Sequence, residues 1–559
     1  MGICLQRIPR IGGHTMLNVG RRLKFAASII TCATTLLAAS NSFAAAMQSY
    51  CYMAENDKDV VGKNENQKMP IASVSKVLTS LAVLSKLGAT AKLYTQFYAM
   101  PVAKDVYDVH IKGSRDPYFA RASMHTLISR LNEMGVTRIR TLTFDENFKY
   151  LYNTNQVNSA GRGKWFDPVT GKAPIDAPSG DFIRLLLLNK RQVMLDYDKS
   201  KKDAATDGVK LVDKPVFDPE KIELVSSTFK PPAKAKTGYV ASMKLIDIIK
   251  YMNWNSNNHV ANSLFLIAGG KEKVEDFYYK KLKVNPAELT FVNGSGQNGD
   301  LTGNGRTYTE ASCSVMVRTL RALKLTLEAQ TKPLKLQDAL AVGGGDIGST
   351  IDAAVYKKYL PAKTVIAKTG TVGVAISLAG LANTKQGNFF FMYNVEPGDA
   401  PRRYKGRNAE RWRMNEAAKS RGMIGQKLAT EMDSLEAGNA LGLEITNPKI
   451  YKQRKLTASR TPGPRGQAIA YNIRHYDVVN FEDSGDENAP ELAEEDTKGF
   501  LAKAKGILSS VVTKLTPVYP QPPAVATKPA ALTPATAASA AAVTTPIKQS
   551  AKPIITAKK

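Results

Sequence analysis

The stretch Pro70-Ile-Ala-Ser-Val-Ser-Lys-Val-Leu-Thr-Ser-Leu-Ala82 places two polar residues, Ser73 and Lys76, at the start of an apolar run. Proline is favoured at the first position of a helix, and the apolar residues that follow predict a helix here. Residues three apart lie on one helical face, so the Lys76 ammonium can reach the Ser73 hydroxyl. A serine attacks poorly until a neighbouring base takes its proton, and a desolvated lysine can be that base. Taken alone, a helix start without any chemistry fits this stretch equally well.

Two further motifs follow in order, Ser256-Asn257-Asn258 and Lys368-Thr369-Gly370. Each tripeptide recurs by chance, but the ordered set with Ser73-Val74-Ser75-Lys76 is typical of serine enzymes of the penicillin-binding and serine β-lactamase type. The third motif lies in a β-rich segment, residues 364–381. A polar turn and an apolar strand at residues 389–395 follow, which predicts an antiparallel hairpin. The glycine of the third motif lets a substrate lie close against the strand.

Two similar motifs are expected to lie outside the site. Ser227-Thr-Phe-Lys230 is followed by Pro231 and Pro232, which prevent a helix from continuing, so its serine and lysine do not share a helical face. Lys236-Thr237-Gly238 precedes an amphipathic segment that starts at Met243. We therefore expect a basic loop before a helix at this second Lys-Thr-Gly.

The sequence resembles the D-alanyl-D-alanine carboxypeptidase/endopeptidase family, the class C low-molecular-mass penicillin-binding proteins of the penicillin-binding protein 4 group. The resemblance covers roughly residues 50–400. Besides the three motifs, it rests on Asp116-Pro117, on Asn293-Gly-Ser-Gly296 and on the glycine-rich segment that starts at Val342. Asn293 departs from the family pattern, in which an acidic residue is usual.

The resemblance implies a catalytic role for each matching residue. Ser73 would attack the carbonyl of the D-Ala-D-Ala peptide bond and form the acyl-enzyme, with Lys76 as the base. Ser256 would relay the proton to the leaving amine. The backbone N–H groups of Ser73 and Thr371 would form the oxyanion hole, which is a large electrostatic contribution in acyl transfer. The base that activates water for deacylation stays open.

The remaining matching residues would bind the substrate. Asn258 would hydrogen-bond a substrate amide. Lys368 would raise the local positive potential, and Thr369 would hold the terminal carboxylate. Gly370 and Thr371 complete this edge of the site. No metal or other cofactor is expected.

The resemblance also implies the fold class, an α/β (α+β) transpeptidase-like fold in which an antiparallel sheet is flanked by helices. Residues 410–436 are expected to form a helix that packs back on this sheet. We expect a signal peptide (1–44), a catalytic domain (45–100 and 236–436), an inserted accessory domain (101–235) and a flexible C-terminal extension (437–559).

The N-terminus has the pattern of a targeting segment. Basic residues up to Lys24 precede an apolar stretch at 25–37, and small residues up to Ala44 suit a cleavage site. We therefore expect a periplasmic protein. Of the four cysteines, Cys51 and Cys313 remain after cleavage. An oxidising periplasm would permit a bridge between them, but two buried thiols fit equally well.

Composition limits the partners. The 559 residues carry a net charge of +28, and a basic surface attracts polyanions. No zinc-finger spacing, phosphate-binding loop or aromatic-basic RNA motif supports a nucleic-acid partner. An amphipathic segment at 500–515 has two interpretations: a peripheral membrane contact, or a helix that docks on its own domain or lies weakly formed in a linker. The second is favoured. The oligomeric state stays open.

The leading function is a peptidase that acts on peptidoglycan stem peptides and that β-lactam antibiotics inhibit covalently. A serine β-lactamase or esterase on the same scaffold is the second hypothesis, and the large insertion argues against it. A catalytically inactive wall-binding protein is the third, and the intact motif residues argue against it. Carboxypeptidase and endopeptidase activities stay open, because both cleave at a D-amino acid with the same serine.

Overall fold

The computed structural model describes residues 47–150, 180–206, 208–226, 228–299, 307–346, 348–384, 387–396 and 406–434. The predicted signal peptide and the predicted C-terminal extension (437–559), which includes the segment 500–515, lie outside the described residues. Ser227 does as well. In the part of the chain that the structure describes, no helix is both long enough and apolar enough to cross a membrane.

The larger sheet has six strands, and every neighbouring pair is antiparallel. In spatial order they are β11 (Ala341–Val342), β12 (Val365–Val372), β13 (Ala375–Thr384), β14 (Gly387–Val395), β1 (Met47–Ala54) and β2 (Val61–Lys63). The predicted hairpin is confirmed as β13 and β14. The segment expected as one strand, 364–381, instead forms two, because the chain reverses at Gly373, which has open space around it.

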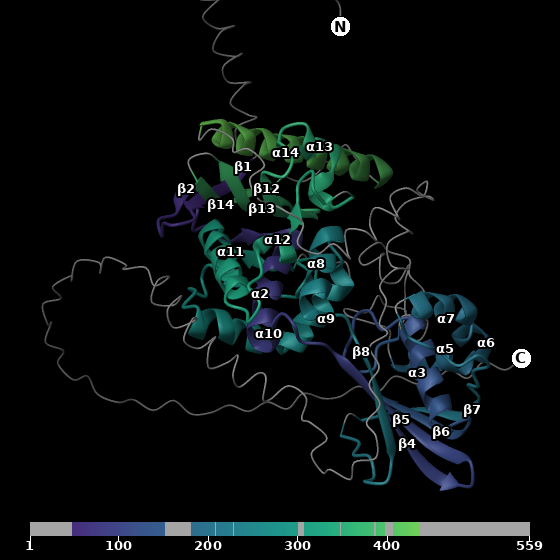
Figure 1. Ribbon diagram of the computed structural model, residues 1–559. Helices are drawn as coiled ribbons and strands as arrows, with labels where there is room; N and C mark the ends of the chain where they lie inside the picture. Colours follow the sequence, from purple (N-terminus) through teal and green to yellow (C-terminus); the bar gives the residue numbers. More distant parts are fainter. Residues whose placement is uncertain are drawn as a thin grey trace, which may run out of the picture. The chain divides into compact units, whose positions relative to one another are not determined.

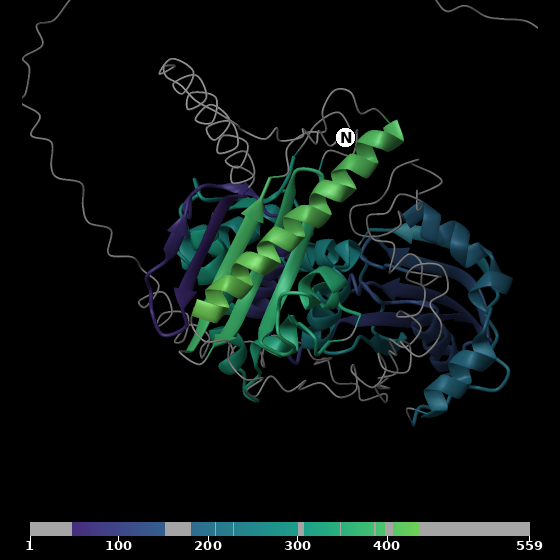
Figure 2. The same cartoon turned by 90° about the horizontal axis from the view of Figure 1, so that it is seen from above.

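Helices cover both faces of this sheet. Figure 2 shows α14 (Gly406–Ser434) running obliquely across the outer face, as the expected packing helix. The inner face packs against a helical layer (Figure 1). This layer consists of η2 (Ala72–Val74), α2 (Ser75–Leu87), α8 (Leu245–Asn255), α9 (Asn258–Ala268), α10 (Gly270–Asp276), η3 (Phe277–Lys281), α11 (Cys313–Glu328) and α12 (Leu336–Ala339).

Short elements complete this part of the molecule. A three-stranded sheet forms beside the start of α2, and two short helices lie between β11 and β12. They are β3 (Met69–Pro70), β10 (Glu310–Ala311) and β9 (Leu289–Thr290), and η4 (Thr350–Asp352) and α13 (Ala354–Lys357).

Helix α2 is the central helix of this layer, and its residues from Ser75 to Ser85 are buried. Most buried hydroxyl groups in proteins are hydrogen-bonded. Thr79 Oγ1 donates to the carbonyl of Gly294 over 2.9 Å, and Ser80 Oγ donates to the carbonyl of Lys76 over 2.7 Å. The helix begins at Ser75 rather than at Pro70, because β3 and η2 come first.

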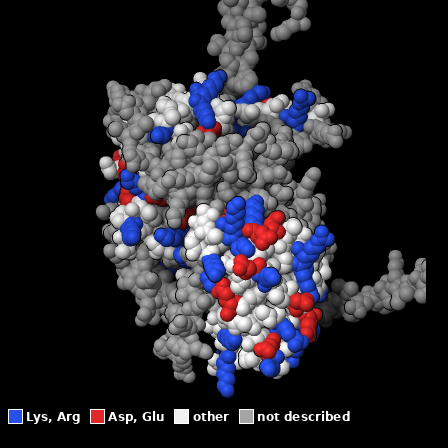
Figure 3. All heavy atoms as spheres, turned by 45° about the vertical axis from the view of Figure 1, so that its right-hand side comes forward, with Lys and Arg blue, Asp and Glu red and all other residues white. Residues whose placement is uncertain are grey.

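A second sheet has five strands and its own apolar core. In spatial order they are β7 (Pro219–Val225), β6 (Arg138–Asp145), β5 (Val106–Lys112), β4 (Tyr94–Ala103) and β8 (Lys236–Ala241). Helices pack on this sheet: α3 (Arg121–Glu133), α5 (Gly180–Leu188), α6 (Lys190–Val193) and α7 (Tyr197–Thr206). Figure 3 shows acidic and basic side chains interspersed over the face of this part that is in view.

The edges of this second sheet differ from the expected accessory segment, residues 101–235. Strand β4 starts before it, and β8 ends after it. The expected loop at Lys236-Thr237-Gly238 is wrong, because these residues form the start of β8 and pair with β4. A strand partner more than 130 residues away in the sequence decides this, and local periodicity does not report it.

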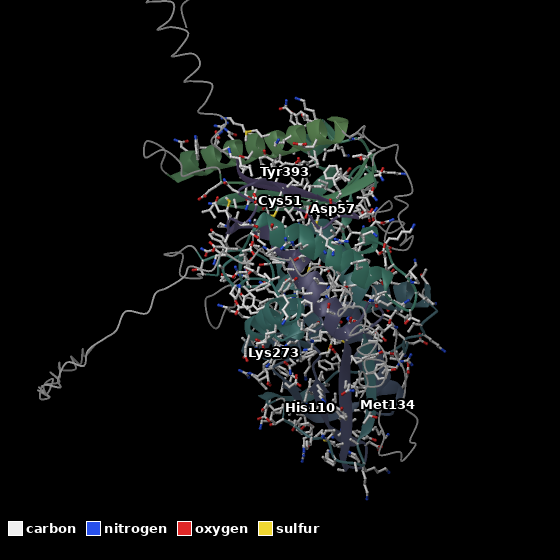
Figure 4. The ribbon with its side chains drawn as sticks, turned by 90° about the vertical axis from the view of Figure 1, so that its left-hand side faces the viewer. Cys51, Asp57, His110, Met134, Lys273 and Tyr393 are labelled. Atoms are coloured by element: carbon white, nitrogen blue, oxygen red, sulfur yellow. A yellow bond between two sulfur atoms is a disulfide. The ribbon has the colours of Figure 1, made fainter. Side chains whose placement is uncertain are left out.

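A disulfide joins Cys51 of β1 to Cys313 at the start of α11, with the two Cα atoms 5.9 Å apart. Of the two alternatives left open by the sequence, the structure therefore has the bridge. In Figure 4, Cys51 lies in the same sheet as Tyr393, whereas His110 and Met134 mark the part that holds the second sheet. The bridge closes a loop of 262 residues that contains the entire second sheet.

Candidate active site

Ser73 lies in the single turn η2, immediately before α2. Its neighbour Ala72 has a φ of 48°, a left-handed conformation that a non-glycine residue adopts at a cost and that is frequent at functional sites. Lys76 follows in the first turn of α2. The Nζ atom of Lys76 lies 2.8 Å from Ser73 Oγ, as the three-residue spacing predicts.

Lys76 has two further contacts, and both are with neutral acceptors. Its Nζ atom donates to Asn258 Oδ1 over 2.7 Å and to the carbonyl of Ser295 over 3.0 Å. Burial lowers the pKa of Lys76 well below 10.5, and the charge of Lys368 lowers it further. A neutral amine has two N–H donors and one lone pair. Because the two carbonyl-type oxygens accept only, the lone pair is left to face the Ser73 hydroxyl.

Ser256 is brought to Lys368. The Nζ atom of Lys368 donates to Ser256 Oγ over 2.9 Å and to the carbonyl of Thr369 over 2.7 Å. Ser256 ends α8 in the left-handed conformation, with a φ of 60°. Lys368 is completely buried, and burial lowers its pKa to about 7.

Asn258 begins α9, whose start is capped by the side chain of Asn257. While its Oδ1 accepts from Lys76, its Nδ2 donates to Gln297 Oε1 over 3.0 Å. The amide group therefore orients the Lys76 amine and is also linked to the loop 293–297. The sequence predicts Asn258 only as a ligand for a substrate amide.

Asn293 holds the loop 293–297 together. Its Oδ1 accepts from the backbone N–H groups of Ser295 over 3.2 Å and of Gly296 over 2.9 Å, and from Ser295 Oγ over 3.0 Å. Its Nδ2 donates to the carbonyl of Gln297 over 3.0 Å. A carboxylate has no N–H, so an acidic residue at this position lacks the last bond. The asparagine thus fixes the Ser295 carbonyl against Lys76 without adding charge.

The Lys-Thr-Gly strand, β12, places alternate side chains on opposite faces of the sheet. Gly370 faces η2, the turn that carries Ser73, and a Cβ atom there would lie 2.9 Å from the carbonyl oxygen of Ile71 and 3.1 Å from the Ala72 Cβ. The glycine is thus needed for the approach of the turn to the strand, in addition to the substrate contact expected from the sequence. Ser377, opposite Gly370 on β13, donates to the Ile71 carbonyl over 2.8 Å.

The side chains of Thr369 and Thr371 lie on the face of β12 opposite to that of Gly370. Thr369 is half-buried, and Thr371 is exposed. Strand β11 pairs only with Ile366 and Ala367. Among the described strands, none pairs with this edge of β12 from Lys368 onward, so an extended peptide has an edge to lie along.

Three contributors to the site were not found from the sequence: the Ser295 carbonyl, Gln297 and Arg421. The Nη2 atom of Arg421, on α14, donates to Thr371 Oγ1 over 3.0 Å. A backbone carbonyl has no signature in the sequence, and Arg421 is 50 residues beyond its partner. Among the described residues, no cluster of three or more His, Cys, Asp or Glu side chains is placed to hold a metal ion.

A protein family and several solved structures are similar to this chain. The model of the D-Ala-D-Ala carboxypeptidase 3 (S13) family matches residues 37–153 and 224–411. Bd3459, a predatory peptidoglycan endopeptidase from Bdellovibrio bacteriovorus, is 30% identical with a TM-score of 0.57, covering 71% of this chain and 94% of that chain.

Two further solved structures from Bdellovibrio bacteriovorus are similar to the chain. Bd3459 acylated by penicillin G, in complex with the immunity protein Bd3460, is 30% identical with a TM-score of 0.54, covering 71% of this chain and 94% of that chain. The predatory endopeptidase Bd0816, in complex with the same immunity protein, is 28% identical with a TM-score of 0.58, covering 78% and 99%. No match was found among curated protein sequences.

Proposed function

This chain belongs to the D-Ala-D-Ala carboxypeptidase 3 (S13) family, and we propose that Ser73 is the nucleophile through which it cleaves peptidoglycan stem peptides. Membership makes the chain a serine peptidase of the penicillin-binding type. Which bonds it cleaves, and which residues cleave them, belong to the proposal.

The contacts of Lys76 are the observation that carries this proposal. The Asn258 and Ser295 oxygens take its two N–H groups, and Ser73 Oγ lies 2.8 Å from the same nitrogen. Burial favours the neutral amine. Lys76 is therefore aimed at the Ser73 hydroxyl, and its environment favours the neutral form that general-base catalysis requires.

The reaction then runs in two stages. Ser73 Oγ attacks the carbonyl carbon while its proton passes to Lys76, and the backbone N–H groups of Ser73 and Thr371 stabilise the oxyanion. Ser256, held by Lys368, gives its proton to the leaving nitrogen and takes in return the proton that Lys76 accepted from Ser73, so that the C–N bond breaks and the amine departs. Water then hydrolyses the ester on Ser73 and releases the shortened peptide.

Carboxypeptidase and endopeptidase activities both follow from this site. In D-Ala-D-Ala, the carbon next to the scissile nitrogen bears a carboxylate. A cross-link through the D-centre of a diamino acid presents the same group at the same place. Lys368 and Thr369 would bind that carboxylate in both substrates, with Asn258 on a substrate amide and Gly370 allowing close approach. The 30% identity to a peptidoglycan endopeptidase supports including the cross-linked substrate.

The proposed substrate places the enzyme outside the cytoplasm, where peptidoglycan lies. The Cys51–Cys313 bridge fits an oxidising compartment. The division into a catalytic domain (45–100 and 236–436) with an inserted segment (101–235) is part of the same proposal.

The test uses a fluorescent penicillin and purified peptidoglycan. The wild-type chain should bind the label covalently, and peptide mass spectrometry should find the adduct on Ser73. Ser73→Ala should abolish labelling and digestion, whereas Ser227→Ala should retain both. Chromatography of the digest then separates loss of a terminal D-Ala from loss of cross-linked dimers. Labelling that survives Ser73→Ala would refute the assignment.

A further inference from the structure

Arg421 occupies an unusual place on helix α14. Ala417, Ile424 and Leu428 of this helix are buried, and they share a face with Arg421 at spacings of four, three and seven residues. Arg421 therefore lies in the stripe that packs on the sheet, where an apolar residue is normal. Arg421 is itself only half-buried, so its guanidinium lies at the edge of this stripe, where it can meet both the strand and a ligand from solvent.

The partner in the structure is a hydroxyl at the end of β12. The Nη2 atom of Arg421 donates to Thr371 Oγ1 over 3.0 Å. In the described part of the chain, Arg421 forms no ion pair with a carboxylate. A guanidinium has five N–H donors in a planar fork that matches a carboxylate. One neutral hydroxyl uses only one of them.

Strand alternation places this guanidinium beside the proposed carboxylate ligand. Gly370 faces η2, so Thr369 and Thr371 both face the side of the sheet that α14 covers. Figure 2 shows α14 crossing this face. The Arg421 guanidinium therefore lies at Thr371, on the same face of β12 as the Thr369 hydroxyl.

We propose that Arg421 is a specificity-determining residue that binds the carboxylate on the carbon next to the leaving nitrogen. Thr369 orients this carboxylate, and Arg421 supplies the fixed positive charge. This inference rests on the proposed function and adds a ligand from the C-terminal helix, outside the three motifs. It makes a free carboxylate a requirement of the substrate.

The register of α14 keeps Arg421 at this position. Ile424 and Leu428 are completely buried beneath the helix. Gly425 lies so close to the segment that follows α13 that a Cβ atom there would be 3.1 Å from the ring of Tyr359. With Ala417 buried before the arginine, the helix is anchored on both sides of Arg421, which fixes the backbone position from which its side chain reaches the strand.

The test measures hydrolysis of two peptides that end in D-Ala-D-Ala, one with a free carboxylate and one with a C-terminal amide. The wild-type enzyme should prefer the carboxylate. Arg421→Ala should lower kcat/KM for the carboxylate peptide about 10- to 100-fold, mainly through KM, and should leave the amide peptide unchanged. Arg421→Lys should restore part of the preference, because it keeps the charge but loses the fork.

Controls separate this role from a structural one. Arg411 is exposed on the same helix, and Arg411→Ala should keep the wild-type preference. Thermal melting should find the Arg421 variants folded. The inference is wrong if Arg421→Ala lowers kcat/KM equally for both peptides, or if it keeps the full preference for the carboxylate peptide. A wild-type enzyme that neither labels with penicillin nor hydrolyses either peptide would instead refute the proposed function.

Discussion

Lys76 and Lys368 are both completely buried, and the charge on Lys368 lowers the pKa of Lys76 beyond the effect of burial. The two amines therefore divide the chemistry. Lys76, whose pKa both burial and this charge lower, faces Ser73 Oγ at 2.8 Å. Lys368, whose pKa is lowered to about 7, holds Ser256 and keeps positive charge near the site up to that pH.

The rate of acylation should have a bell-shaped dependence on pH. Neutral Lys76 is the form that accepts the proton, so the rate rises with pH through its pKa, which lies well below 10.5. Loss of the Lys368 charge above about 7 weakens binding of a carboxylate, so kcat/KM then falls. Stopped-flow acylation from pH 5 to 10 checks this. A rate that rises only near the ordinary lysine pKa would contradict it.

Replacing Lys368 should show that only one of the two Lys-Thr-Gly motifs takes part in acylation. Lys368→Ala removes the donor to Ser256 and the charge beside the substrate, so acylation should slow about 100-fold. The increase of this variant's acylation rate with pH should occur at higher pH than in the wild type, because Lys76 loses the cation that lowers its pKa. Lys236→Ala is the matched control. Lys236 lies in β8 of the second sheet and donates to the Met134 carbonyl, so acylation by this variant should stay at the wild-type rate.

Asn293→Asp should test the neutrality of the loop beneath Lys76. A carboxylate loses the bond to Gln297 and adds negative charge next to the Ser295 carbonyl. The added charge favours the protonated amine and raises the pKa of Lys76, so the rise of the acylation rate with pH should move to higher pH. Asn285→Asp, on an exposed turn, is the control. Equal pH profiles for the two variants would show that Asn293 does not tune Lys76.

Removing the disulfide should cost stability and leave the chemistry intact. The bridge closes a loop of 262 residues, and chain entropy gives an upper estimate of about 5 kcal/mol for such a loop. A Cys51→Ala, Cys313→Ala double variant should therefore melt at a lower temperature than the wild type. Adding a reductant should not change the melting temperature of this variant. Its penicillin labelling at low temperature should match that of the wild type. Loss of labelling in a folded variant would place the bridge in the site.

Truncation should locate the end of the part that the chemistry needs. A chain that ends at residue 480 keeps α14 and should still be acylated. A chain that ends at residue 405 loses Ile424 and Leu428, which are buried, and should fail to fold. Circular dichroism and penicillin labelling measure both. If residues 500–515 bind membrane, only the full chain should sediment with anionic vesicles at low salt.

Local sequence patterns were sufficient to predict contacts between residues that are close together in the chain. The three-residue spacing predicted the contact between Lys76 and Ser73, and the apolar run predicted α2. Alternation and a polar turn predicted the hairpin of β13 and β14. The pattern failed at Lys236-Thr237-Gly238, which reads as a loop but forms a strand. There the partner strand, β4, lies far away in the sequence.

The sequence by itself determined the fold class and the family, and it named the motif residues whose site roles are proposed here, because residue type and spacing are local properties. Tertiary structure alone decided which distant groups complete the site. It placed the Ser295 carbonyl on Lys76, joined Cys51 to Cys313 and set Arg421 against Thr371. Each of these contacts closes a long loop, and only packing of the whole core offsets the entropy of closing it.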